Sequence, residues 1–171
     1  MNELVLEQFS TDIDRLKIPK FLNWNKRHLF HSNADTFYFR SRFALSDGFS
    51  TDATRYIHSG GTVTYAALQI IYFLGFRKVI IIGLDHYYKE KGAPGKTEVR
   101  KSHKDESHFH QDYFPQGFKW QLPDLRRSEL AFNQARLAFE KDGRVIIDAT
   151  VDGQCSVFEK ADFYRLFPVK R

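Results

Sequence analysis

The stretch that decides the fold reads His58-Ser59-Gly60-Gly61-Thr62-Val63-Thr64-Tyr65 and continues, after an apolar run, as Lys78-Val79-Ile80-Ile81-Ile82-Gly83-Leu84-Asp85. Between the two segments, apolar residues recur at helical spacing from Ala66 to Leu74 without a proline or an internal glycine, which predicts an amphipathic helix. Gly75 suits the left-handed position that ends a helix. The β-branched run 79–82 is typical of a strand covered on both faces. A helix, a tight turn and a buried strand form half of a parallel α/β unit.

The turn before this helix offers a site for an anion. The segment Ser59-Gly60-Gly61-Thr62 leaves backbone N–H groups at a helix N-terminus, where the helix dipole favours negative charge and glycine lets a ligand approach closely. The alternative is an ordinary loop with a Ser or Thr cap. Asp85 follows the carboxyl end of the buried strand, where open α/β sheets bind their ligands. A turn-forming Asp is the simpler alternative for that position.

The composition indicates one globular domain of 171 residues, of which 42% are hydrophobic and 16% aromatic. A net charge of +5 is compatible with a phosphate-bearing ligand, an anionic membrane surface or nucleic acid, and it selects none of them. The single cysteine, Cys155, excludes an intramolecular disulfide framework and favours a reducing compartment. No signal peptide and no apolar run long enough to span a bilayer is visible, so we expect a cytoplasmic location and no transmembrane segment.

The remaining elements are predicted from periodicity and from turn residues. The expected elements are a strand at Leu4–Leu6, a short helix from Ser10, a strand at Phe21–Trp24, a strand at Asp35–Phe43, a long helix at Asp124–Lys141, a strand at Arg144–Ala149, an extended piece at Ser156–Glu159 and a helical turn at Asp162–Leu166. The fold class that we predict over residues 1–171 is α/β, as a three-layer Rossmann-like domain with a mostly parallel sheet.

A long irregular insertion at 86–122 separates the central strand from the second long helix. Loops of this length are usually lids, binding loops or disordered segments. The first half, 89–104, is rich in lysine and arginine and contains two glycines and a proline. A solvated loop is one interpretation of this half, and a basic flap over a phosphorylated ligand is the other.

The second half of the insertion is dense in aromatic rings and imidazoles. His108 and His110 point the same way on an extended chain, so a metal pair completed by Asp112 or His103 is one interpretation. No third ligand at a fixed spacing supports it, and we expect no metal. A histidine general base, or contacts from imidazoles and Tyr113 to phosphates and sugar hydroxyls, is more plausible chemistry. Simple aromatic packing of a loop is the structural alternative.

Several blocks of the sequence together resemble a bacterial family. They are Ser-Gly-Gly-Thr-Val-Thr-Tyr-Ala-Ala-Leu-Gln at 59–69, Gly-Phe-Arg-Lys-Val-Ile-Ile-Ile-Gly-Leu-Asp-His at 75–86, His-Phe-His-Gln-Asp-Tyr-Phe at 108–114, Asp-Gly-Arg-Val-Ile-Ile-Asp-Ala-Thr at 142–150 and Val-Phe-Glu-Lys at 157–160. The family is the group of uncharacterised proteins related to archaeal 6-hydroxymethylpterin diphosphokinase, which often occur with surface polysaccharide genes. This group is similar in layout to the family 42 bacterial sialyltransferases, which use a CMP-activated sugar on a Rossmann-like domain.

The resemblance implies roles for the residues singled out above. Ser59-Gly60-Gly61-Thr62 would contact the nucleotide or its pyrophosphate, and Asp85 would line the cleft. The phosphates and the acceptor proton would be handled by side chains of the insertion, which are His108, His110 or Tyr113. The resemblance does not say which histidine is the base. The function it implies is a nucleotide-binding, glycosyltransferase-like domain of surface polysaccharide biosynthesis, with a nucleotide or nucleotide sugar as substrate and no tightly bound cofactor.

One departure from the resemblance leaves alternatives open. Such families open with a buried strand and a short Asn-Gly-Pro-Ser-like loop that helps to hold the nucleotide, and nothing in this sequence matches that unit. Either the chain is a fragment that lacks the first strand, or catalytic activity has been lost. A diphosphokinase-like version would hold ATP phosphates with magnesium, and a non-catalytic binding module is the rival class. We expect no nucleic-acid partner; a peripheral contact with an anionic membrane is compatible with the charge.

Overall fold

The computed structural model describes residues 3–42, 47–87, 97–99, 119–121 and 123–168 of the chain. The helical segments are α1 (Glu3–Gln8), α2 (Ser10–Arg15), the 3-10 helix η1 (Trp24–Leu29), α3 (Val63–Phe73), α4 (Leu125–Lys141) and α5 (Phe163–Leu166). The strands are β1 (Lys20–Asn23), β2 (Thr36–Phe39), β3 (Ser41–Arg42), β4 (Ile57–His58), β5 (Lys78–Ile81), β6 (Thr97–Val99), β7 (Lys119–Gln121), β8 (Val145–Asp148) and β9 (Glu159–Lys160).

The strands pair mostly in parallel. The order β5-β8-β9 is parallel throughout, with Val79 opposite Ile146. The pairs β1–β2 and β3–β4 are also parallel, and only Arg40 separates β2 from β3. The pair β6–β7 is antiparallel. Helices mixed with short parallel sheets are compatible with the predicted α/β class.

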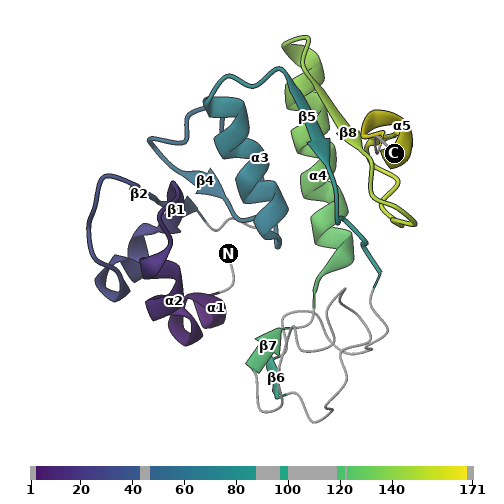
Figure 1. Cartoon of the computed structure of the whole chain (residues 1–171). Coiled ribbons are helices and arrows are strands. Elements are labelled where there is room, and N and C mark those ends of the chain that lie inside the picture. The colour runs from purple at the N-terminus through teal and green to yellow at the C-terminus, as the bar shows by residue number, and fades with distance from the viewer. Residues whose placement is uncertain (1–2, 43–46, 88–96, 100–118, 122, 169–171) are drawn as a thin grey trace.

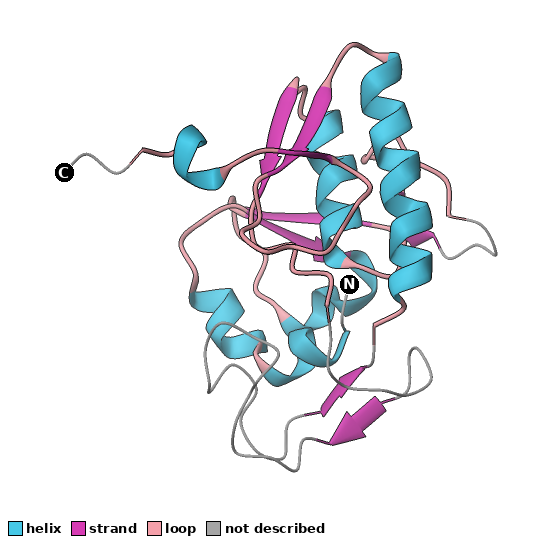
Figure 2. Ribbon diagram, turned by 90° about the vertical axis from the view of Figure 1, so that its right-hand side faces the viewer, coloured by secondary structure: helices cyan, strands magenta, loops and turns pink. Residues whose placement is uncertain are grey.

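The main core lies between two helices and the sheet that contains β5 and β8. Figure 1 shows α3 and α4 standing side by side next to β5 and β8, with α5 beyond β8 on the opposite side from α4. Figure 2 shows the same arrangement from the side. The buried residues that pack together here are Tyr65, Leu68, Tyr72, Val79, Ala131, Phe132, Ala135, Phe139, Ile146, Cys155 and Phe158. Burying such apolar surface is the main force that fixes α3 and α4 on the sheet.

A fully buried amide joins α3 to β4. The Gln69 side chain is 0% exposed, and its Oε1 accepts the backbone N–H groups of His58 (2.9 Å) and Ser50 (3.1 Å). Its Nε2 donates to the carbonyls of His58 (2.9 Å) and Tyr65 (3.1 Å). All the strong hydrogen-bonding capacity of the amide is therefore used. The Gln69 side chain thus binds both the backbone N–H and the backbone carbonyl of His58. These bonds fix the start of the turn that leads into α3.

The structure confirms most of the predicted elements and corrects one. The central helix and strand are present as α3 and β5, and the later long helix and strand as α4 and β8. The strand predicted at Leu4–Leu6 is wrong, because this segment lies in α1. Glu, Leu and Gln favour a helix, and Leu6 packs with Leu22 and Phe30 in a separate small core. The pair β6–β7 lies inside the insertion, where no strand was predicted.

Candidate functional site

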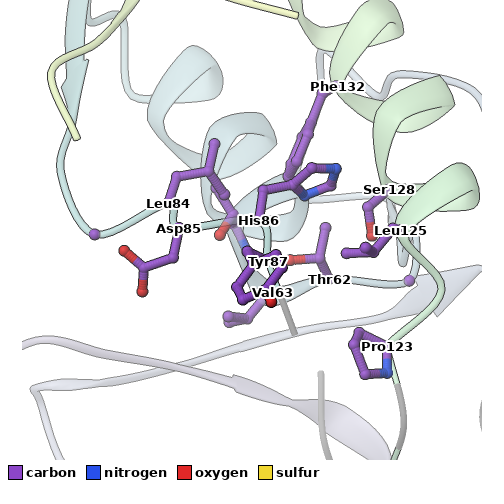
Figure 3. Close-up of a pocket in the computed structure, with 13 residues that line it drawn as sticks. Thr62, Val63, Leu84, Asp85, His86, Tyr87, Pro123, Leu125, Ser128 and Phe132 are labelled. Atoms are coloured by element: carbon purple, nitrogen blue, oxygen red, sulfur yellow. The ribbon is translucent and has the colours of Figure 1, made fainter. Parts of the chain in front are cut away.

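A cavity of about 310 Å³ lies where three chain segments meet. The first is the turn at the start of α3, the second is the loop after β5, and the third is the beginning of α4. The lining residues are Gly61, Thr62, Val63, Thr64, Gly83, Leu84, Asp85, His86, Tyr87, Pro123, Leu125, Ser128 and Phe132 (Figure 3). The cavity therefore lies at the carboxyl end of a parallel strand and at the N-terminus of a long helix, the two features that the sequence singled out.

Gly60 fixes the turn against the two helices and does not line the cavity. Its φ is +55°, and a Cβ there would lie 2.2 Å from Tyr65 Cδ1 and 2.8 Å from Ala131 Cβ. Only glycine fits this close approach of the turn to α3 and α4. Its N–H donates to Asp47 Oδ1 at 3.2 Å, so this amide is already used within the protein. Gly60 is thus a packing residue of the turn.

A partly buried ion pair contacts the same turn on the side away from the cavity lining. Arg127, in the first turns of α4, donates from Nε to Asp47 Oδ2 (2.7 Å) and from Nη2 to Asp47 Oδ1 (3.2 Å). Arg127 Nη2 also donates to Ser59 Oγ at 3.1 Å, which gives this hydroxyl a structural partner. Burial by itself would raise the pKa of the Asp47 carboxyl, but hydrogen bonds from Arg127 and Gly60 outweigh it and hold the pKa below its ordinary value. Asp47 is therefore ionised and tied to α4.

The backbone amides on the cavity side of the turn are the groups available to a ligand. The Thr62 N–H donates to the Ser59 carbonyl (3.2 Å), and the Thr62 hydroxyl caps α3 by accepting the Thr64 N–H (3.3 Å). Among the described residues, the N–H groups of Gly61 and Val63 have no acceptor. Both belong to residues that line the cavity. Two unused donors at the positive end of an 11-residue helix favour an anion.

The loop after β5 is tied to the loop after β8. The Leu84 N–H donates to Thr150 Oγ1 at 2.9 Å, and the Asp85 carbonyl accepts the Gln154 N–H at 2.8 Å. These bonds fix the backbone on both sides of the Asp85 side chain. Asp85 lines the cavity, and Figure 3 shows its carboxylate pointing away from the His86 imidazole.

His86 is a site residue that the sequence reasoning did not single out. Its backbone has φ +54°, and its side chain is only 6% exposed. Its Nε2 lies 3.1 Å from Glu129 Oε1 on α4, and its ring contacts that of Phe132 at a centroid distance of 6.1 Å. The signal that pointed to Asp85, its place just past the end of a buried strand, applies equally to His86. The partner on α4 is 43 residues away and leaves no local trace in the sequence.

The structure brings only some of the predicted site residues together. Gly61, Thr62 and Asp85 line the cavity, whereas Ser59 and Gly60 lie behind it in the Asp47 network. The remaining candidates, His108, His110 and Tyr113, lie outside the described residues, so their proposed roles stay predictions. Within the described residues, no three His, Cys, Asp or Glu side chains gather as a metal site would require.

Comparisons with family models, curated proteins and solved structures found no match to this chain. Across the described segments, no helix is both long and apolar enough to cross a membrane.

Proposed function

We propose that the cavity binds the phosphate groups of a nucleotide or nucleotide sugar, and that the chain is a nucleotide-binding, glycosyltransferase-like domain of bacterial surface polysaccharide biosynthesis. One observation carries the phosphate-binding part of the proposal, and the glycosyltransferase-like part follows from the family resemblance. The unused N–H groups of Gly61 and Val63, at the start of α3, share a cavity with the loop that follows parallel strand β5. In α/β proteins, phosphates bind where a helix N-terminus meets the carboxyl end of a parallel strand.

The volume of the cavity suits the phosphate end of this ligand class. Its volume of about 310 Å³ is at the lower end of the range for small-molecule sites, which matches the phosphate end of a nucleotide better than a whole nucleotide sugar. Asp47 pairs with Arg127 and does not line the cavity, whereas Asp85 does line it and points its carboxylate away from the His86 imidazole (Figure 3). In the proposed arrangement, β5, β8 and β9 belong to a three-layer, Rossmann-like fold, with α3 leading into β5 as in a parallel α/β unit.

The test places a competing carboxylate at the proposed phosphate position. Val63 is the first residue of α3 and is 59% exposed, so a longer polar side chain fits there. Val63→Glu stabilises a helix N-terminus by about 0.3–1 kcal/mol while repelling an anion. Val63→Gln has the same shape without the charge and is the matched control. The measurement is the melting temperature of each protein with CMP, CDP, UDP or ATP.

The expected result is a nucleotide-specific stabilisation that the carboxylate abolishes. At a ligand concentration of roughly ten times Kd, binding to the folded state stabilises it by about 1.4 kcal/mol. This corresponds to roughly 3–5 °C for a chain of this size. Wild type and Val63→Gln should show the shift, and Val63→Glu should lose it. Equal shifts in the two variants would place the phosphate elsewhere. No shift in the wild type with any nucleotide would leave the non-catalytic binding module as the better description.

The same measurement addresses the diphosphokinase-like alternative. That version predicts a shift with ATP that requires Mg²⁺, because magnesium bridges the phosphates of bound ATP. The sialyltransferase-like version predicts the larger shift with CMP or CDP. The cavity geometry alone favours a phosphate, which the two alternatives share.

A further inference from the structure

His86, which lines the cavity, pairs with Glu129 of α4, which does not line it. The His86 side chain is more than nine-tenths buried, yet it belongs to the cavity wall. Figure 3 shows its imidazole between Phe132 and Thr62, on the same side as Ser128. A positive φ is uncommon for a residue with a side chain, and here it turns the ring inward from the end of β5. The backbone bonds of Leu84 and Asp85 hold the loop in that conformation.

The contact with Glu129 determines which ring nitrogen is free. An ionised carboxylate only accepts hydrogen bonds, so a neutral His86 ring must carry its proton on Nε2, 3.1 Å from Glu129 Oε1. The lone pair is then on Nδ1, for which the described residues provide no hydrogen-bond partner. The Glu129 side chain is 47% exposed and also lines an open hollow with Asn133, so its carboxylate remains hydrated.

We propose that His86 is the general base of this site and that Glu129 positions it. This inference rests on the proposed function. A hydroxyl group of the acceptor binds next to Nδ1, and its proton moves to Nδ1 as its oxygen attacks the carbon bonded to the donor phosphate. The bond between that carbon and the phosphate oxygen breaks, and its electron pair leaves with the nucleotide at the N-terminus of α3. The imidazolium that forms is stabilised by Glu129, as in other carboxylate–histidine pairs.

The placement differs from the roles that the family resemblance implies. The resemblance implies that His108, His110 or Tyr113 of the long insertion handles the phosphates and the acceptor proton. His86 instead lies on a short loop fixed by neighbouring strands, and a base is most effective when its geometry is preorganised. A phosphate contact from the insertion and a base at His86 are compatible, because the two roles concern different atoms of the substrate.

The first experiment tests the pair without a substrate. Long-range ¹H–¹⁵N NMR reports which imidazole nitrogen carries the proton, and the His86 signals are assigned by their loss in His86→Asn. Asparagine is chosen because it tolerates positive φ. At about pH 8.5, where imidazoles are neutral, His86 should be protonated on Nε2, and Glu129→Gln should change its tautomer balance. A ring protonated on Nδ1, or an even mixture of the two tautomers in wild type, would overturn the proposal.

The second experiment separates this proposal from the proposed function. It measures the slow hydrolysis of CMP-, CDP- and UDP-activated sugars, in which water replaces the acceptor. His86→Asn should lower kcat by about 100-fold or more, with KM and the nucleotide-induced melting shift unchanged. Added imidazole should restore part of the rate in His86→Gly, which a purely structural role does not predict. Hydrolysis within about threefold of wild type in His86→Asn would overturn the base assignment while nucleotide binding stands. A wild type with no nucleotide shift and no hydrolysis would overturn both.

Discussion

Arg127 on α4 binds both carboxylate oxygens of Asp47, eighty positions earlier in the chain, at 2.7 and 3.2 Å. The same guanidinium contacts Ser59, and the same carboxylate accepts the Gly60 N–H. The turn at the start of α3 is thereby joined to the start of α4. Because the cavity lies between these two helix ends, this pair sets the geometry of the proposed phosphate site.

Removal of Arg127 should destabilise the fold far more than removal of Arg136 on the same helix, because the two arginines are similarly exposed but the carboxylate that pairs with Arg136 is 51% exposed. The Asp47 side chain is only 7% exposed, so Arg127→Met leaves a buried carboxylate without its counter-ion. The expected loss is about 3 kcal/mol. Arg136 pairs with Glu140 on the exposed side of α4, and Arg136→Met should cost at most about 0.5 kcal/mol. Urea unfolding of the two variants makes the comparison, and equal losses would show that the Asp47 pair is energetically a surface pair.

Gln69 should be irreplaceable by an apolar side chain of similar size. Gln69→Met keeps the volume but leaves the N–H and carbonyl of His58 and the Ser50 N–H without their partner, in a region closed to water. Unsatisfied buried groups cost about 1–3 kcal/mol each, so we expect a loss of about 3 kcal/mol or more. The measurement is urea unfolding.

Gln134, on the exposed side of α4, provides the control for Gln69. Gln134→Met should change the free energy of unfolding by less than about 0.5 kcal/mol. If Gln69→Met were equally mild, water or a backbone shift would have to satisfy the His58 groups.

The elements that surround the cavity were predictable because their signals are local. An apolar run of helical period produced α3 and α4, and β-branched runs produced β5 and β8. The parallel pairing of β5 with β8 then places Asp85 at the carboxyl end of the sheet, next to the helix that begins at Val63. These rules depend on residues close together in the sequence.

The rest of the site depends on pairs that are distant in the sequence. Asp47 and Arg127 are 80 positions apart, and His86 and Glu129 are 43 apart. Each residue alone resembles an ordinary polar side chain of a loop or of an exposed helix face. Only the packing of α4 against the loops that contain Asp47 and His86 makes them partners. Gly60 is a further example, because the sequence indicated a ligand contact but gave no sign of the close approach of Tyr65 and Ala131.

Acidification should destabilise the protein through His58. This side chain is 9% exposed, and burial holds its pKa below the ordinary value of 6.5, with a smaller effect of Arg42 in the same direction and an opposing effect of Asp47. Between the folded pKa and 6.5, the unfolded chain binds a proton that the folded chain does not. The stability that His58 contributes is therefore present above pH 6.5 and is lost as pH falls through the folded pKa.

Urea unfolding from neutral to mildly acidic pH tests this sign. His58→Gln should lose less stability on acidification than the wild type does. His31 has the opposite sign, because its hydrogen bond to Asp14 raises its pKa and its contribution is present at low pH. His31→Asn should therefore lose more stability on acidification than the wild type. If His58→Gln followed the wild-type curve, His58 would be protonated equally in the folded and unfolded states.

Two glycines with positive φ should respond very differently to alanine. Gly75, after α3, has φ +88°, and a Cβ there would meet nothing within 4 Å. Gly75→Ala therefore bears only the conformational cost, about 1–2 kcal/mol. Gly60→Ala bears a similar cost and also drives a Cβ into Tyr65 and Ala131, which are 0% and 1% exposed and cannot move aside.

We expect Gly60→Ala to lose about 3–5 kcal/mol in urea unfolding, the conformational cost plus that of overpacking a closed core. Gly60→Ala combined with Ala131→Gly removes one of the two steric conflicts, so it should recover part of the loss. Ala131→Gly combined with Gly75→Ala should recover none of the stability that Gly75→Ala loses, because a Cβ at Gly75 does not contact Ala131. Equal losses for Gly60→Ala and Gly75→Ala would mean that the turn can move away from α4. In that case it could not hold the amides of Gly61 and Val63 at a fixed phosphate position.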